Sequence, residues 1–169
     1  MARSGDDARA TSVQPWPEAV ERVALYLRSA GAEARIEELE SGTATAEAAA
    51  EAIGCAVAQV VKSLVVVCDG VPAVALVPGD RRGDMAKVAR ALGARQARVG
   101  RHGEVRSATG FAPGAVAPFP LAHRVVCDRS LLRHAVVWCG AGSDRHMVCL
   151  APIELVRLAR AELADLVHE

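Results

Sequence analysis

Two neighbouring runs of β-branched residues constrain the fold of this chain more than any other feature. The runs span residues 60–68 and 73–77, and the four residues between them read DGVP. β-Branched residues favour strands, and an Asp-Gly step between two such runs is typical of a hairpin. The pattern therefore predicts two central antiparallel strands.

The remaining periodicity places helices around these strands. Apolar residues at helical spacing predict four helices, over residues 17–30, 46–53, 84–92 and from 152 through Leu163 to Leu166. Further strands are expected over residues 34–39, 124–128, 135–139 and 146–150. Hairpins mixed with helices, without regular βαβ alternation, indicate an α+β class built on a mixed sheet. With 3% aromatic residues and 34 alanines, the core is expected to consist of Ala, Val and Leu.

Domain organisation and compartment follow from composition. Residues 1–14 are small and polar and are expected to be disordered, and residues 15–169 are expected to form a single domain. No apolar run reaches the roughly 18 to 20 residues that cross a bilayer, and no signal peptide is evident. The five cysteines form no C-x-x-C pair, and no cluster has metal spacing. We therefore expect a cytoplasmic protein with reduced cysteines, no metal, no cofactor and no membrane partner.

Lys62 places a charge inside the first β-branched run. It is one of two lysines beside eighteen arginines, and it shares a strand face with Val60 and Leu64. If that face is covered, the ammonium must point into a polar cavity or meet a partner. A compact ammonium suits a small site in a way that an arginine fork does not. A lysine that protects an edge strand, or one that reaches solvent, explains the same pattern.

Two segments rich in glycine are candidate ligand-binding loops. Residues 109–119 (TGFAPGAVAPF) cannot continue a helix or a central strand, so we expect a shaped loop that a ligand can approach. Residues 140–143 (GAGS) lie between two predicted strands, and their backbone donors are suited to a carboxyl or hydroxyl group. A packed loop and a simple hairpin turn are the alternative interpretations.

Two further side chains carry alternatives that the sequence leaves open. Asp128 precedes Arg129-Ser130 at a strand end, and is either a cap or a site carboxylate. Cys139 is a candidate nucleophile with His146 as its base, although no third group is evident, and a buried core cysteine fits equally.

Charge is zero overall but uneven along the chain. Residues 80–106 contain seven arginines and Lys87 against three acidic residues, a local net charge of plus five. Residues 33–51 contain six glutamates against one arginine, or minus five. The first segment predicts a basic surface for phosphate, and solvated faces are the alternative.

Taken in order, these segments resemble the YbaK/prolyl-tRNA-synthetase-associated domain family. The resemblance rests on a helix ending in IGC, then QVVKSLVVV, DG, VPAVALVPGDRR, MAKVARALGA, TGFAPGAVAPF, VVCDRSLL and a late GAG. It covers roughly residues 44–163. It implies a single α+β domain whose mixed, mostly antiparallel, curved sheet is flanked by helices. It also implies an aminoacyl-tRNA deacylase that hydrolyses the ester of a mischarged small amino acid.

The same resemblance assigns roles to individual residues. Lys62 matches the functional lysine, which is thought to contact the terminal adenosine, and Gly114 to Pro118 match a G-x-x-x-P loop. The expected substrate-binding residues are Gly110, Gly114, Pro118, Asp128, Gly140, Gly142 and Ser143. The expected partners are the acceptor end of aminoacylated tRNA and prolyl-tRNA synthetase.

An aminoacyl ester is already activated, so a positioned water and a polarised carbonyl suffice without a covalent intermediate. Alanine, cysteine and serine on tRNA for proline are the expected substrates. A non-catalytic module that binds aminoacyl-tRNA or an amino acid fits the same residues, and a general esterase using Cys139 is a third hypothesis. Turnover distinguishes the first two.

Overall fold

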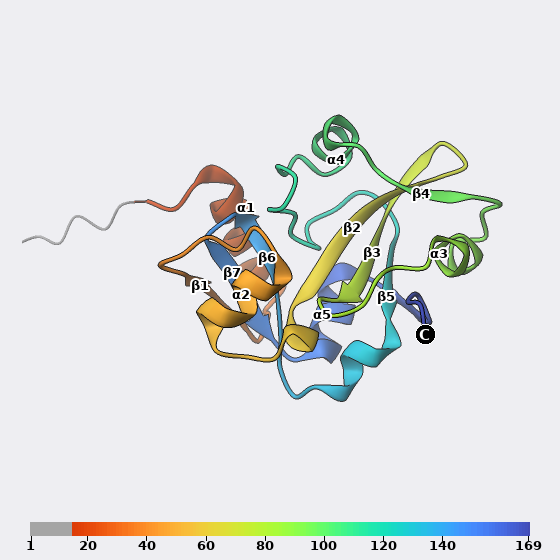
Figure 1. The fold of residues 1–169 in the computed structure, drawn as a ribbon. Coiled ribbons are helices and arrows are strands. Elements are labelled where there is room, and N and C mark those ends of the chain that lie inside the picture. The colour runs from red at the N-terminus through yellow and green to blue at the C-terminus, as the bar shows by residue number, and fades with distance from the viewer. Residues whose placement is uncertain (1–14) are drawn as a thin grey trace, which may run out of the picture.

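The strands form two sheets, where the sequence predicts one. The protein is described by a computed structural model over residues 15–169, and the expectation for residues 1–14 lies outside this range (Figure 1). One sheet has three strands in the order β1-β7-β6, and the other has five in the order β4-β2-β3-β5-β8. Two pairs, β3 with β5 and β5 with β8, are parallel, and all other named pairs are antiparallel. The α+β class with a mixed, mostly antiparallel arrangement is confirmed.

The elements have the following bounds. The strands are β1 (Ala34–Glu38), β2 (Val61–Cys68), β3 (Val71–Pro78), β4 (Ala97–Val99), β5 (Val125–Asp128), β6 (Val137–Ser143), β7 (His146–Leu150) and β8 (Glu162–Ala164). The helices are α1 (Glu18–Ser29), α2 (Ala46–Ile53), α3 (Met85–Ala91), α4 (His102–Thr109) and α5 (Pro152–Ala159), with 3-10 turns η1 (Val57–Gln59) and η2 (Arg129–Arg133). None of these helices is long and apolar enough to span a membrane.

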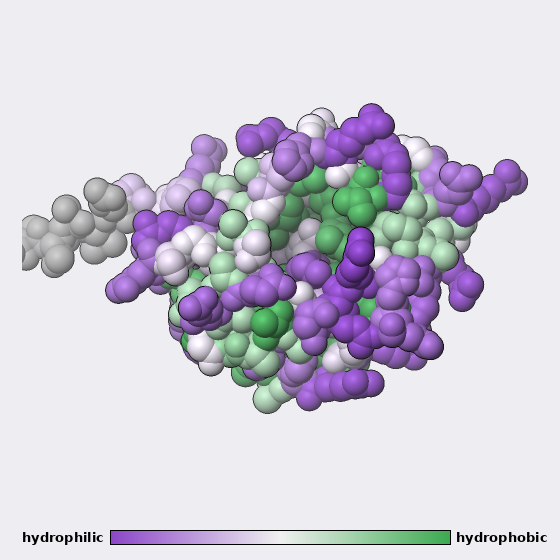
Figure 2. Space-filling model, viewed as in Figure 1, coloured by the Kyte–Doolittle hydropathy of each residue, from purple (hydrophilic) through white to green (hydrophobic). Residues whose placement is uncertain are grey.

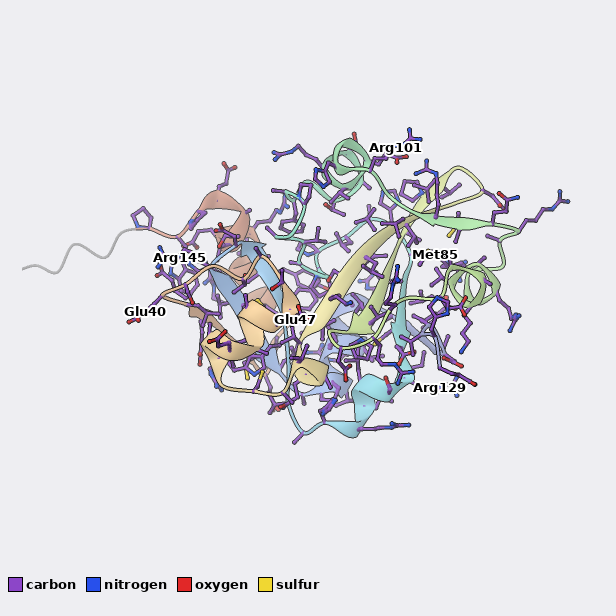
Figure 3. The ribbon with its side chains drawn as sticks, viewed as in Figure 1. Glu40, Glu47, Met85, Arg101, Arg129 and Arg145 are labelled. Atoms are coloured by element: carbon purple, nitrogen blue, oxygen red, sulfur yellow. The ribbon has the colours of Figure 1, made fainter. Side chains whose placement is uncertain are left out.

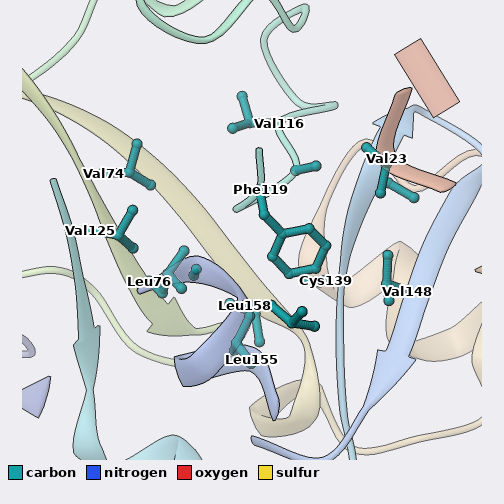
Figure 4. Close-up of a cluster of buried hydrophobic side chains, with 14 of the residues drawn as sticks. Val23, Val74, Leu76, Val116, Phe119, Val125, Cys139, Val148, Leu155 and Leu158 are labelled. Carbon is teal, nitrogen blue, oxygen red and sulfur yellow. The ribbon is translucent and has the colours of Figure 1, made fainter. Parts of the chain in front are cut away.

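The core lies between the two sheets. It gathers one face of each sheet with α1, α5 and the 111–119 segment, and Figure 4 shows Phe119 at its centre between Leu76 and Val148. The outer face of the five-stranded sheet packs against α3, and the outer face of the three-stranded sheet packs against α2. Apart from Phe111 and Phe119, the core is aliphatic or cysteine, as the composition predicts.

The predicted hairpin is confirmed, with a tighter connection. Asp69 and Gly70 alone form the turn, with positive φ of 49° and 81°, and the two following residues already belong to β3. A two-residue turn with both φ positive matches the right-handed twist of paired strands. The central strands are therefore in full register from Val61↔Pro78 to Cys68↔Val71.

Three segments differ from the prediction. The helix predicted from residue 152 onward is α5, and it ends at Ala159 because Arg160 adopts a left-handed conformation (φ 52°). The chain then forms β8, which pairs in parallel with β5. Residues 140–143 lie inside β6 at a register shift, and the chain reverses at Asp144 and Arg145. β4 and α4 were not predicted, because β4 has three residues and only Val105 and Thr109 of α4 are buried.

The pairing of β2 leaves part of one edge open. β6 meets this edge at Val60, which bridges Trp138, and β4 pairs with it only from Val66 onward. Within residues 15–169, no strand pairs with the intervening edge at residues 62–64. This gap positions the candidate site.

Candidate active site

A cleft of about 410 Å³ lies along the open edge of β2. Its walls come from β2, β6, the first turn of α2 and the loop before it, and the 111–119 segment. Figure 2 shows this face hollowed between α2 and α4, with hydrophobic residues inside and hydrophilic residues at the rim. A cleft of this volume is within the range that holds small ligands.

Lys62 lies in the wall of this cleft and is half-buried. Its Nζ donates a hydrogen bond to the backbone carbonyl of Arg81 at 2.8 Å. The loop that carries this carbonyl is itself held by the C-terminal residues: the Asp84 N–H donates to the Leu166 carbonyl at 2.7 Å, and the His168 N–H donates to the Arg82 carbonyl at 3.1 Å. An ammonium has three donors, so two remain for a ligand.

Glycines let the cleft walls approach one another. A Cβ on Gly140 would lie 2.6 Å from the Val116 carbonyl oxygen, so only glycine allows β6 to lie against the 111–119 segment. A Cβ on Gly79 would lie 2.6 Å from the Val57 carbonyl oxygen. Gly114 also lines the cleft, and its φ of +80° favours glycine. Two of these three glycines were expected at the site, and Gly79 was not.

Ser143 lines the cleft next to a buried imidazole. Its Oγ accepts the Arg145 N–H at 3.0 Å and lies 2.6 Å from His146 Nδ1. Burial lowers the pKa of His146, and the nearest carboxylate, an oxygen of Glu38, lies 4.0 Å from Nε2. The imidazole is therefore neutral near pH 7, and it holds the Ser143 hydroxyl in the wall.

Four of the expected substrate-binding residues lie outside the lining of the cleft. Gly110 ends α4 beside the Arg22 guanidinium, and Pro118 is buried in the loop that carries Gly114. Gly142 has a φ of +103°, and a Cβ added to it would lie 2.9 Å from the backbone of Ala19 in α1.

Asp128 is the fourth and acts as a cap. Its carboxylate accepts hydrogen bonds from the Ser130 N–H and hydroxyl, and from the Leu166 N–H at 2.8 Å. The side chain is 2% exposed. Of the two interpretations of Asp128, the structure therefore supports the cap.

Sequence reasoning did not identify several lining residues as part of the site. They are Thr43, Thr45, Glu47, Ser63, Gly79 and Met147, with others that are apolar. Thr45 was recognised only as the N-cap of α2, where its Oγ1 accepts the Ala48 N–H at 3.1 Å. Ser63 follows Lys62 directly, which is the one local signal available. Gly79 lies in the segment VPAVALVPGDRR, but no local pattern marks it, or Thr43, Glu47 and Met147, as part of a site. Only tertiary contact brings these residues to the cleft.

Cys139 does not reach the cleft. Its side chain is fully buried among Phe119, Val148 and the rest of the core (Figure 4), and burial raises the pKa of its thiol well above the ordinary range. A nucleophilic cysteine needs an accessible thiolate. The geometry therefore gives no support to the esterase hypothesis.

The family model for the aminoacyl-tRNA editing domain matches residues 40–158. The uncharacterized protein YwhH of Bacillus subtilis (strain 168) is 37% identical over 123 residues, which are 71% of this chain and 78% of that protein. The chain therefore belongs to the aminoacyl-tRNA editing domain family, and the resemblance inferred from its motifs is confirmed.

Solved structures extend this comparison. The crystal structure of a "putative trans-editing enzyme for prolyl tRNA synthetase" is 35% identical with a TM-score of 0.84, covering 92% of this chain and all (100%) of that one. The "hypothetical protein APE2540" is 28% identical with a TM-score of 0.81, covering 87% of this chain and 99% of that one. Family and neighbour together support a deacylase.

Proposed function

We propose that this chain hydrolyses the ester that joins a mischarged alanine, cysteine or serine to a tRNA, with tRNA for proline as the carrier. Water adds to the ester carbonyl, and the free amino acid and the 3′-terminal hydroxyl of the tRNA are released. The observation that carries the proposal is the cleft at the open edge of β2, where Lys62 presents two unused donors beside walls kept narrow by glycine. The neighbour described for prolyl-tRNA synthetase supports the choice of tRNA and of that synthetase as a partner.

A positioned water is the proposed nucleophile. Among the cleft-lining residues there is no thiol, and the one lining hydroxyl in contact with an imidazole, that of Ser143, already accepts a backbone N–H. Lys62 is proposed to hold the terminal adenosine, with Gly114 and Gly140 shaping the space beside it. Because the aminoacyl ester is activated, orientation and a polarised carbonyl can supply the rate.

The direct test measures amino acid released from Ala-, Cys-, Ser- and Pro-charged tRNA for proline. We expect fast loss of at least one mischarged species, sparing of Pro-tRNA, and no protein-bound amino acid after acid quenching. Binding of charged tRNA without release would instead establish the non-catalytic module. A protein-bound ester would overturn the positioned-water mechanism.

The segment of residues 80–106 is the proposed contact for tRNA phosphates. It runs through α3, β4 and α4 (Figure 1), and its Arg81 carbonyl accepts a hydrogen bond from Lys62 in the cleft wall. Within it, the hydrogen-bonded Arg98 lowers the pKa of Glu104 to about 2, so this arginine is engaged within the protein. Arg101, at the start of α4, forms no ion pair with any residue in the range 15–169 and is exposed (Figure 3).

We therefore expect kcat/KM to fall as salt rises. Each phosphate contact contributes a slope of about −0.7 to −0.9 in a plot of log kcat/KM against log salt concentration. Arg101→Ala should reduce the magnitude of this slope by about 1, whereas Arg133→Ala, on the exposed surface of η2, should leave it unchanged. A slope near zero for the unmodified protein would exclude this segment as a phosphate contact.

A further inference from the structure

Two opposite charges line the cleft from different walls. Lys62 projects from β2 and Glu47 from the first turn of α2, and all other lining residues are uncharged. Figure 3 shows Glu47 at the end of α2 nearest to β2. The two side chains do not form an ion pair with each other, and across residues 15–169 Glu47 forms no ion pair at all. A ligand in the cleft therefore meets a separated positive and negative charge.

Three of the other polar side chains of the lining already form hydrogen bonds within the protein. The Thr43 hydroxyl donates to the Asp144 carbonyl at 2.8 Å, and Thr45 caps α2. Ser143 is held by a backbone N–H and by His146. The Ser63 hydroxyl has no hydrogen-bond partner among residues 15–169, but it is uncharged and its oxygen is buried away from solvent. By elimination, the carboxylate of Glu47 is the one accessible charged acceptor among the described residues of the lining.

The position of Glu47 is fixed by packing. Ala49 and Ala50 of α2 are buried against the three-stranded sheet, and the Thr45 cap sets where the helix begins. The cleft thus presents the Glu47 carboxylate and the Lys62 ammonium from two different walls.

We propose that Glu47 pairs with the α-ammonium group of the aminoacyl ester, so that the site requires a substrate whose amino group is free. This inference rests on the proposed function and adds the orientation of the substrate. An α-amino group is largely protonated near pH 7, and it would be repelled from Lys62 and attracted to Glu47. The ammonium end of the ester then lies at α2, and the nucleotide end lies at Lys62. N-acylated amino acids, which lack the positive charge, are excluded.

The test compares alanyl-tRNA with N-acetylalanyl-tRNA for the unmodified protein, Glu47→Gln and Glu51→Gln. Glu51 lies one turn further along α2, is exposed and does not line the cleft, so it is the matched control. A lost charge-assisted contact lowers kcat/KM about 10- to 100-fold. We expect Glu47→Gln to slow release from alanyl-tRNA by this factor, and to leave the rate for N-acetylalanyl-tRNA the same as in the unmodified protein. Glu47→Asp should be faster than Glu47→Gln on alanyl-tRNA, because it keeps the carboxylate. Glu51→Gln should match the unmodified protein.

A binding measurement separates this inference from the proposed reaction. The probes are 3′-alanylamino-3′-deoxyadenosine, whose amide resists hydrolysis, and its N-acetyl derivative, titrated by calorimetry. The inference is supported if the free amine binds more tightly than its N-acetyl derivative and Glu47→Gln removes this difference. If that result is obtained but no ester is hydrolysed, the deacylase proposal alone fails. Equal affinity for the two probes, or equal slowing of both esters by Glu47→Gln, would overturn the role of Glu47.

Discussion

Replacing Lys62 with alanine is expected to lower kcat/KM for the preferred mischarged tRNA by up to about a hundredfold, the loss expected when a charge-assisted contact to the terminal adenosine is removed. The ammonium is half-buried and oriented by the Arg81 carbonyl at 2.8 Å. Within the described lining of the cleft it is the one cation, so no neighbouring group can take its place. The measurement is the initial rate of amino acid release at subsaturating tRNA.

Two variants make this result specific. Arg133→Ala also removes one positive charge, but from the exposed surface of η2, and should retain the full rate. Lys62→Arg keeps the charge but replaces a compact ammonium with a planar fork, and should remain impaired. Full activity of Lys62→Ala, with its folding verified by circular dichroism, would remove Lys62 from the proposed site.

Gly140→Ala should impair both stability and activity. The added Cβ would lie 2.6 Å from the Val116 carbonyl oxygen, so β6 and the 111–119 segment must separate. Overpacking of this kind costs about 1 to 3 kcal/mol, and each kcal/mol lowers Tm by roughly 2 to 4 °C in a domain of this size. Because Gly140 and Val116 both line the cleft, kcat/KM should fall as well. Thermal unfolding and deacylation rates provide the two readouts.

Gly103→Ala is the matched control for this change. Gly103 lies in α4, and a Cβ added to it would have no neighbouring atom within 4 Å. Alanine is favoured over glycine in a helix by up to about 1 kcal/mol, so Tm should stay constant or rise. If Gly140→Ala behaved like this control, close contact between the two walls would not be what shapes the cleft.

Local chemistry accounts for the elements that could be predicted. α2 has the predicted bounds because Thr45 caps its first turn and Gly54 ends it at φ 82°. The β2-β3 hairpin follows from its β-branched runs and the Asp-Gly turn. Such signals lie within a few residues of the structure they specify, so no knowledge of the rest of the fold is needed.

Elements that depend on distant partners could not be predicted in the same way. Leu163 and Leu166 continue a helical pattern, yet β8 forms there because the exposed edge of β5 supplies its hydrogen-bond partners. The three residues of β4 become a strand only against β2. Gly140 and Gly142 are typical of a turn in sequence. In the structure, Gly140 makes room for the Val116 carbonyl and Gly142 makes room for the α1 backbone.

The site residues were likewise predicted only in part. Lys62, Gly114, Gly140 and Ser143 were recognised from sequence motifs, and the fold brings these four to one cleft. Gly110, Pro118, Asp128 and Gly142 come from the same motifs, but they lie outside the lining. Motifs identify residue types and spacing, whereas a cleft is defined by which backbone segments end beside one another. The placement of Lys62 and Glu47 on different walls of that cleft depends on where α2 packs relative to the open edge of β2, which no local pattern encodes.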